Sequence, residues 1–210
     1  GVPNHPIGEI YDGYKNRPWQ KEKMDGIKVV RTWVYPTPNR KAWERIFNYS
    51  SFGISSGLGL LLTDSPDVVI GSSPQLLAGV SGYLASNLKK APFVFEVRDL
   101  WPESIEASGP TKNPLLMNTL RSISNYLYRN SDRVVVVTRS FKKEISEKGI
   151  SEEKIDVVPN GVDLNLFDPD QKVNSPINGI DADNKFIVSY VGTHGAAHGL
   201  KKVLEVAKDT

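Results

Sequence analysis

The stretch that decides the fold is Arg133–Phe167, which reads RVVVVTRSFKKEISEKGISEEKIDVVPNGVDLNLF. Its β-branched run Val134–Val137 is typical of a strand that is covered on both faces, as in a parallel sheet. A second apolar run, Ile155–Val158, ends at Pro159, which cannot continue a central strand. The residues between the two runs predict a helix, so the whole stretch is a strand–helix–strand unit.

The helix inside this unit has signals at both ends. Ser140 is suited to the N-cap, and Gly149 stands where a C-cap is expected. Phe141 and Ile145 share one helical face. After the second strand, Asn160–Gly161 predicts a tight turn in which the glycine takes a positive φ. This turn lies at the carboxyl end of a strand, the edge where open α/β sheets bind ligands.

The same alternation of strands and helices recurs along the chain. Gly1–Trp19 is rich in Pro, Gly and Asn and predicts a surface loop. Strands are predicted at Ile27–Tyr35, Asp67–Ile70, Phe93–Val97 and Phe186–Val191. Apolar stripes at helical spacing predict two further helices and consist of Leu77, Val80, Leu84 and Leu88, and of Leu116, Leu120, Ile123 and Leu127. The pattern predicts an α/β fold with a Rossmann-like parallel sheet.

Composition narrows the possible functions. The chain has 210 residues, a formal net charge of +2, three histidines and no cysteine. The absence of cysteine excludes disulfides and thiolate metal sites, and we expect no metal and no other cofactor. The small net charge gives no reason to expect nucleic acid as a partner. No signal-peptide pattern opens the sequence, so we expect a reducing, cytoplasmic location.

Three motifs in a fixed order resemble the retaining glycosyltransferases of family 4, which have the GT-B fold. The motifs are FEVRDLWPES from Phe95, VVPNGVD from Val157 and YVGTHGAAHGL from Tyr190. The resemblance covers nearly the whole chain. It is strongest to bacterial enzymes that build surface polysaccharides, of the L-fucosamine transferase kind.

The resemblance implies two domains. Residues 1–167 would form the acceptor-side domain without its first strands, 168–185 a linker, and 186–210 the start of a Rossmann-like donor-binding domain. In the family, a strand, a helix and a strand precede the position of Gly1, and a pair of glutamates follows that of Thr210. We therefore expect the chain to be a fragment of a longer enzyme.

Arg98 and Asp99 are the candidate catalytic residues. They follow a predicted buried strand, where two charges are costly unless they are used or well paired. The family places a site residue here, commonly a histidine where this chain has Arg98. An arginine binds phosphate through two parallel hydrogen bonds. The alternative is an ion pair of Arg98 with Asp99 or Glu103 that only shapes the loop.

The loop Gly192–Gly199 is the candidate donor-binding site. A glycine-rich loop between a strand and a helix start suits an anion, because free N–H groups and the helix dipole face the ligand. In the family this loop approaches the donor diphosphate. Many members have Arg after the first glycine and Lys before the last, where this chain has Thr193 and His198. The candidate donor-binding residues are Gly192, Thr193, His194 and His198.

His5 and the run Gly71–Pro74 each have both a functional and a structural interpretation. His5 lies on the acceptor side of the family's fold, where it would touch a substrate hydroxyl or phosphate; the alternative is a solvent-exposed loop histidine. Asn160 and Gly161 would belong to the loop between the two domains. The short run Gly71–Pro74 suits a phosphate cradle or a plain strand-to-helix connection.

Residues 40–55 are a candidate membrane-contacting segment. Cations alternate there with aromatic rings, namely Arg40, Lys41, Arg45, Trp43 and Phe47. Such a mixture suits the surface of an anionic membrane, and the alternative is an amphipathic helix with a solvated basic face. The apolar run Phe52–Leu62 is too short to span a bilayer and predicts a helix packed in the core.

The expected function is transfer of a sugar from a nucleotide-sugar donor to a polyprenyl-linked or saccharide acceptor, with retention. The enzyme would be cytoplasmic, with peripheral contact to the inner face of the membrane. The alternative from another class is a non-catalytic nucleotide-sugar or phosphate-binding α/β module.

Overall fold

A computed structural model of the protein describes residues 1–4, 7–38, 41–108, 113–168, 170, 187–192, 194 and 198–208. The backbone separates into two compact units. The first comprises Gly1–Glu106 and Pro110–Pro159, and the second Ala107–Gly109 and Asn160–Thr210.

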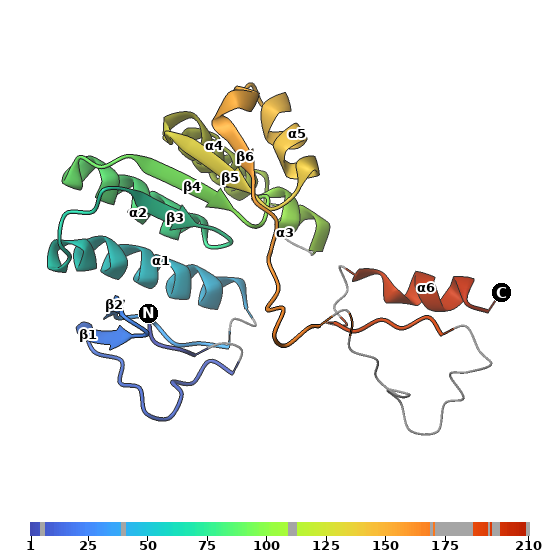
Figure 1. Ribbon diagram of the computed structural model, residues 1–210, viewed down its shortest axis with the longest axis horizontal. Coiled ribbons are helices and arrows are strands. Elements are labelled where there is room, and N and C mark those ends of the chain that lie inside the picture. Colours follow the sequence, from blue (N-terminus) through green and yellow to red (C-terminus); the bar gives the residue numbers. More distant parts are fainter. Residues whose placement is uncertain are drawn as a thin grey trace. The chain divides into compact units, whose positions relative to one another are not determined.

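The first unit is built on a parallel four-stranded sheet. Its strands lie in the order β3 (Val69–Ser72), β4 (Phe93–Val97), β5 (Arg133–Val136) and β6 (Ile155–Val157), as Figure 1 shows. The connecting helices are α2 (Leu76–Lys89), α3 (Glu103–Ser108), α4 (Pro114–Asn130) and α5 (Arg139–Glu147), with a short 3₁₀ turn, η2 (Glu152–Lys154). The predicted α/β, Rossmann-like architecture is confirmed.

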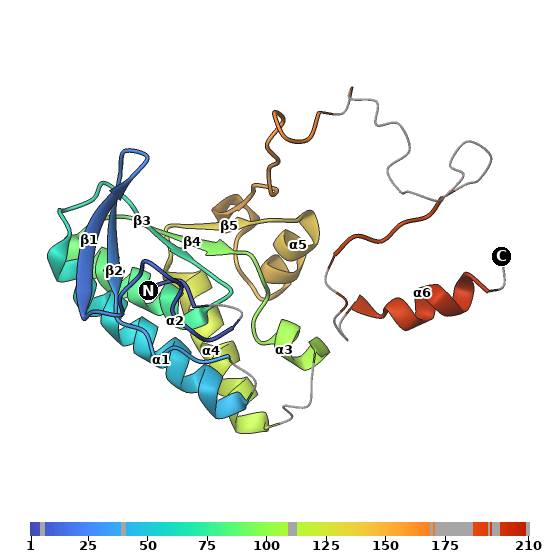
Figure 2. The same ribbon diagram turned by 90° about the horizontal axis from the view of Figure 1, so that it is seen from below.

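One face of this sheet forms the core. Phe93, Phe95, Val134, Val136 and Ile155 are fully buried in a cluster to which α2, α4 and α5 contribute Leu76, Leu127 and Ile145. In Figure 2, α1, α2 and α4 lie on one side of the strands. The opposite face carries exposed or half-buried residues, namely Ile70, Val94, Val135 and Asp156. The expectation that Val134–Val137 is covered on both faces is therefore wrong, because the helices pack on one side.

The helical predictions hold with adjusted ends. The N-cap of α5 is Thr138, whose Oγ1 accepts the N–H of Phe141 at 3.2 Å, so the predicted cap Ser140 lies inside the helix. Gly149 has φ +84° just after the helix, as its position predicted. In α2 the outer part of the predicted stripe, Leu84 and Leu88, is exposed, because the helix buries its small residues instead.

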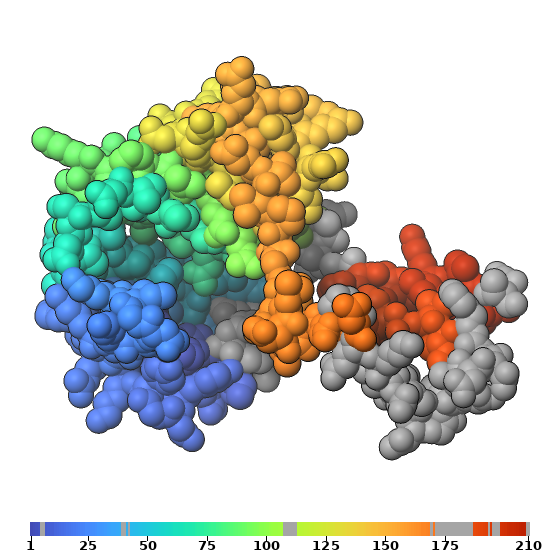
Figure 3. Space-filling model, in the orientation of Figure 1, coloured from blue at the N-terminus to red at the C-terminus, as the bar shows by residue number. Residues whose placement is uncertain are grey.

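A hairpin precedes the sheet. Strand β1 (Trp19–Met24) pairs antiparallel with β2 (Ile27–Thr32), and Trp19 lies opposite Thr32. The two-residue turn Asp25–Gly26 has φ of 49° and 85°, as a primed hairpin turn requires. Only the second strand was predicted. In the space-filling view the blue N-terminal segment lies on one side of this unit and the yellow β5–β6 end on the other (Figure 3).

Helix α1 (Ala42–Gly59), followed by the 3₁₀ turn η1 (Leu60–Leu62), joins the hairpin to the sheet. The predicted core packing of Phe52–Leu62 applies to one face only. Gly53 lies against α2, where an added Cβ would stand 3.1 Å from the Cβ of Leu77. The other face leaves Ile54 and Leu58 exposed.

In its larger segment, Asn160–Thr210, the second unit contains one described helix, α6 (Leu200–Val206), which the sequence predicted. Two other predictions here are wrong. Residues 187–191 form no strand, because no described segment supplies a partner for their backbone groups. Asn160–Gly161 forms no turn and Gly161 has no positive φ, because the chain runs on from β6 without reversing.

Among the described residues, no helix is both long enough and apolar enough to cross a membrane.

The close contact of α2 with the sheet yields a stability prediction. A Cβ on Gly79 would lie 2.7 Å from Cε2 of Phe95 and 3.1 Å from Cδ1 of Leu127, all in the core. We expect Gly79→Ala to lower the free energy of unfolding by about 1–2 kcal/mol, measured by urea denaturation.

Gly57 in α1 is the matched control, because a Cβ there would meet nothing within 4 Å. We expect Gly57→Ala to raise the free energy of unfolding by up to roughly 1 kcal/mol through helix propensity. Equal effects of the two substitutions would contradict the packing argument.

Candidate functional site

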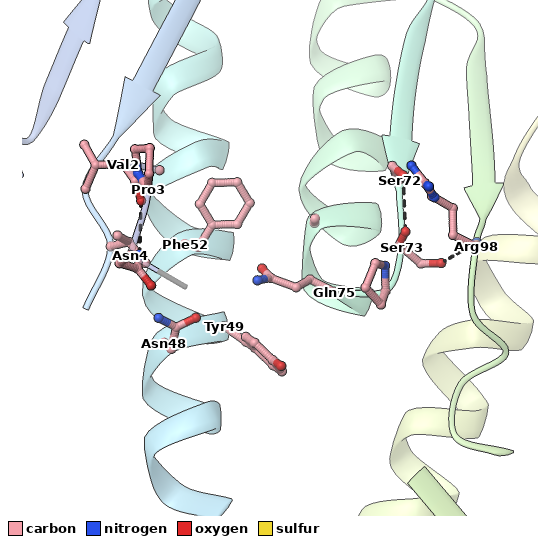
Figure 4. Close-up of a pocket in the computed structure, with 14 residues that line it drawn as sticks. Val2, Pro3, Asn4, Asn48, Tyr49, Phe52, Ser72, Ser73, Gln75 and Arg98 are labelled. Carbon is pink, nitrogen blue, oxygen red and sulfur yellow. Dashed lines mark hydrogen bonds between the residues drawn. The ribbon is translucent and has the colours of Figure 1, made fainter. Parts of the chain in front are cut away.

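A cavity of about 640 Å³ lies at the carboxyl ends of β3 and β4 (Figure 4). Its walls come from the N-terminal segment, from α1, from the β3–α2 connection and from the residue that follows β4. All of these segments belong to the first unit. This is the edge of a parallel sheet where ligands are expected to bind.

Ser73 joins the two loops that form one wall. It is only 2% exposed, and its Oγ accepts the backbone N–H of Arg98 at 3.0 Å. Its own N–H donates to the carbonyl oxygen of Glu96 at 2.9 Å. The serine hydroxyl in the run Gly71–Pro74 therefore fixes the start of the Arg98 loop.

Arg98 lines the cavity with an exposed side chain that reaches toward Ser72 in Figure 4. Asp99 is also exposed, but it is not among the described residues that line the cavity. Glu103, a candidate partner of Arg98, pairs with Nζ of Lys148 at 2.7 Å. Of the two predicted catalytic residues, the structure thus places Arg98 in the cavity wall.

Two side-chain amides face the cavity without full hydrogen bonding. Asn48 is 4% exposed, and its Nδ2 donates to the carbonyl oxygen of Tyr35 at 2.7 Å. Among the described residues its Oδ1 accepts no hydrogen bond. The Oε1 of Gln75 is buried and likewise has no partner in the described part of the chain. In Figure 4 the Gln75 side chain extends from the start of α2 into the space toward α1, and the Asn48 amide lies on α1 close to Asn4.

The cavity combines acceptor oxygens with positive charge. Two unpaired amide oxygens suit a ligand that carries O–H or N–H groups. Arg98 supplies a permanent cation, and α2 begins directly after Gln75 with its positive dipole end at the same edge. Tyr49, held edge-on against Trp101 with ring centroids 6.3 Å apart, adds an aromatic wall. These features together suit a hydroxyl-rich ligand that bears an anionic group.

Sequence reasoning missed Asn48 and Gln75, because neither belongs to a motif. The only signal for Asn48 is an amide inside a largely apolar helical run, and Gln75 looks like an ordinary residue before a helix. Their role depends on α1 and α2 being side by side, which the sequence pattern does not state.

The second unit brings the two predicted histidines to one aromatic ring. The ring of Tyr190 lies 5.8 Å from that of His194 and 6.4 Å from that of His198. Gly192 is next to this group, and an added Cβ would stand 3.1 Å from Oη of Tyr190. A cavity of about 430 Å³ is lined by Tyr190, His194 and residues of α6.

Four further predicted site residues remain, and the structure describes two of them. His5 and Thr193 lie outside the described residues. Asn160 and Gly161 are exposed in the segment that follows β6.

Comparison with known proteins identifies relatives of this chain. Residues 10–161 match the family described as the glycosyl transferase 4-like domain. The chain is 26% identical over 214 aligned residues to WcaI of Escherichia coli strain K12, which is named for a proposed role as a colanic acid biosynthesis glycosyl transferase. The alignment covers 98% of this chain and 51% of WcaI, so the chain spans about half the length of this relative.

The unpaired amide of Gln75 yields a prediction that needs no substrate. A buried oxygen without a partner costs stability, and an apolar side chain of similar size removes that cost. We expect Gln75→Leu to raise the free energy of unfolding by about 1 kcal/mol in urea denaturation.

Gln75→Glu provides the comparison, because it would bury a charge at the same position and lower the free energy of unfolding. A loss of stability in Gln75→Leu would mean that the amide is satisfied within the protein and does not await a ligand.

Proposed function

This chain belongs to the glycosyl transferase 4-like family. We propose that the protein is a glycosyltransferase that acts in surface-polysaccharide synthesis. The full protein would move a sugar, with retention, from a nucleotide-sugar donor to a polyprenyl-linked or saccharide acceptor. The match with WcaI supports the assignment to polysaccharide synthesis, since that relative is named for colanic acid.

The observation that carries the proposal is the cavity at the ends of β3 and β4, whose Arg98 and amides lie within the matched residues. We assign this cavity to the acceptor. Hydroxyl groups of a saccharide would donate to the oxygens of Asn48 and Gln75, and a phosphate of a lipid-linked acceptor would bind the guanidinium of Arg98.

We assign the donor to the segment Gly192–Gly199 of the second unit, on the basis of its resemblance to the family's diphosphate loop. In a retaining transfer the bond between the sugar and the diphosphate breaks, and negative charge accumulates on the leaving diphosphate. Backbone N–H groups and the imidazoles of His194 and His198 would stabilise this charge without a metal.

The direct test is product formation by the full-length enzyme. We expect mass spectrometry to detect one transferred sugar when the enzyme meets a panel of nucleotide sugars and either polyprenyl-diphosphate saccharides or free saccharides. Tight binding of a nucleotide sugar with no product from any acceptor would favour the non-catalytic binding module instead.

Arg98 is the residue with the sharpest expected effect. A lysine keeps the charge but lacks the planar guanidinium that binds phosphate through two hydrogen bonds. We expect Arg98→Lys to lower kcat/KM by about tenfold or more and Arg98→Ala to lower it further, with little change in melting temperature.

Arg129, exposed near the end of α4, is the matched control, and Arg129→Lys should leave both activity and melting temperature unchanged. If Arg98→Ala instead lowered the melting temperature while activity per folded molecule stayed constant, Arg98 would be a structural residue of its loop.

A further inference from the structure

A carboxylate that has no role in the proposed acceptor site stands next to the cavity. Glu96 lies on β4, two residues before Arg98, and is half-buried on the face of the sheet that the helices leave open. Its register partner on β3 is Ser72. Both Ser72 and Arg98 line the cavity, whereas Glu96 reaches it only through these two neighbours.

This carboxylate orients the hydroxyl group of Ser72. The Oγ of Ser72 donates to Oε2 of Glu96 at 2.5 Å, and its longer hydrogen bond goes to the carbonyl oxygen of Ser73 at 3.2 Å. A hydroxyl group carries one proton and two acceptor lone pairs. Because the proton is directed at Glu96, Ser72 offers acceptor lone pairs to a ligand in the cavity and no donor.

Strand pairing alone explains Glu96 poorly. Its register partner on β5 is Val135, whose side chain has no donor, and glutamate is not a favoured strand residue. Among the residues that the structure describes, Glu96 forms no ion pair and its Oε1 accepts no hydrogen bond. A half-buried charge with so few partners is costly unless it is used. The position therefore points to a ligand.

Glu96 and Arg98 bring opposite charges to the same end of β4. Side chains two residues apart point to one face of a strand, with their Cα atoms roughly 7 Å apart. Figure 4 shows the Arg98 side chain reaching toward Ser72, the register partner of Glu96. The carboxylate accepts hydrogen bonds from hydroxyl groups, and the guanidinium donates hydrogen bonds to phosphate. A ligand at this wall meets both groups at once.

We propose that Glu96 and Ser72 determine which sugar the cavity accepts. The pair accepts hydrogen bonds from the O–H groups of an uncharged sugar ring while Arg98 binds the attached phosphate. The negative charge of Glu96 repels a sugar that carries a carboxylate, such as a uronic acid. The inference rests on the proposed function, from which it takes that the cavity holds a sugar phosphate.

The test is an NMR titration of the full chain, which needs neither a donor nor turnover. The ligands are methyl phosphate, which has no sugar, the 1-phosphates of glucose and galactose, and the 1-phosphates of the two corresponding uronic acids. Each neutral sugar differs from its uronic acid only in a hydroxymethyl group in place of a carboxylate. We expect at least one neutral sugar phosphate to bind about tenfold more tightly than its uronic acid and than methyl phosphate.

Two variants separate the charge of Glu96 from the hydrogen bond of Ser72. Glu96→Gln keeps an acceptor oxygen and removes the charge, so the preference for the neutral sugar over the uronic acid should fall by about tenfold. Methyl phosphate should bind this variant more tightly than the parent, because a negative charge near Arg98 is lost. Ser72→Ala keeps the charge, so it should weaken the neutral sugar phosphate by about threefold and leave the discrimination against the uronic acid intact.

Asp156→Asn is the matched control, because Asp156 is also a carboxylate on the open face of the sheet, on β6. It should bind every ligand as the parent does. Circular dichroism and melting temperature would verify that each variant is folded.

Two outcomes would overturn the inference, and they differ in what they leave standing. If Arg98→Ala weakens binding but Glu96→Gln changes the affinity for all ligands by the same factor, Glu96 only joins two strands, and the assignment of the cavity to the acceptor stands. If no ligand binds, or Arg98→Ala changes nothing, the cavity is no sugar-phosphate site, and the acceptor assignment falls together with the inference.

Discussion

The close approach of α2 to the sheet is the constraint on which the first unit depends. Gly71 on β3 and Gly79 and Gly82 on α2 allow it, since a Cβ on Gly82 would stand 3.1 Å from Cα of Gly71. This contact fixes the position along the strands at which α2 begins. It therefore places Gln75 at the carboxyl edge of the sheet. Ser73, in the same connection, then fixes the backbone of Arg98. Packing in the core thus determines the geometry of the cavity.

One wall of the cavity contains a buried polar atom without a partner among the described residues. The Oε1 of Gln75 costs stability in the free protein, because burial removes water without supplying a donor. A ligand with hydroxyl groups would recover this cost on binding.

Helix α1 serves two surfaces at once. One face packs on α2 and supplies Asn48 and Tyr49 to the cavity, while another leaves Ile54 and Leu58 exposed.

The sequence by itself determined the strand and helix order of the first unit, because buried β-branched runs and helical stripes are local patterns. It also located Arg98 at the end of a strand. The hairpin was not predicted from the strand pattern, although the Asp25–Gly26 pair at its turn is a local signal for one. Tertiary structure decided which strand faces are covered, that Gly161 needs no positive φ, and that residues 187–191 form no strand. Tertiary structure alone also brought Asn48, Gln75 and Arg98 into one cavity. Their meeting depends on how α1, α2 and the β4 loop pack, and packing joins residues far apart in the chain that no local pattern relates.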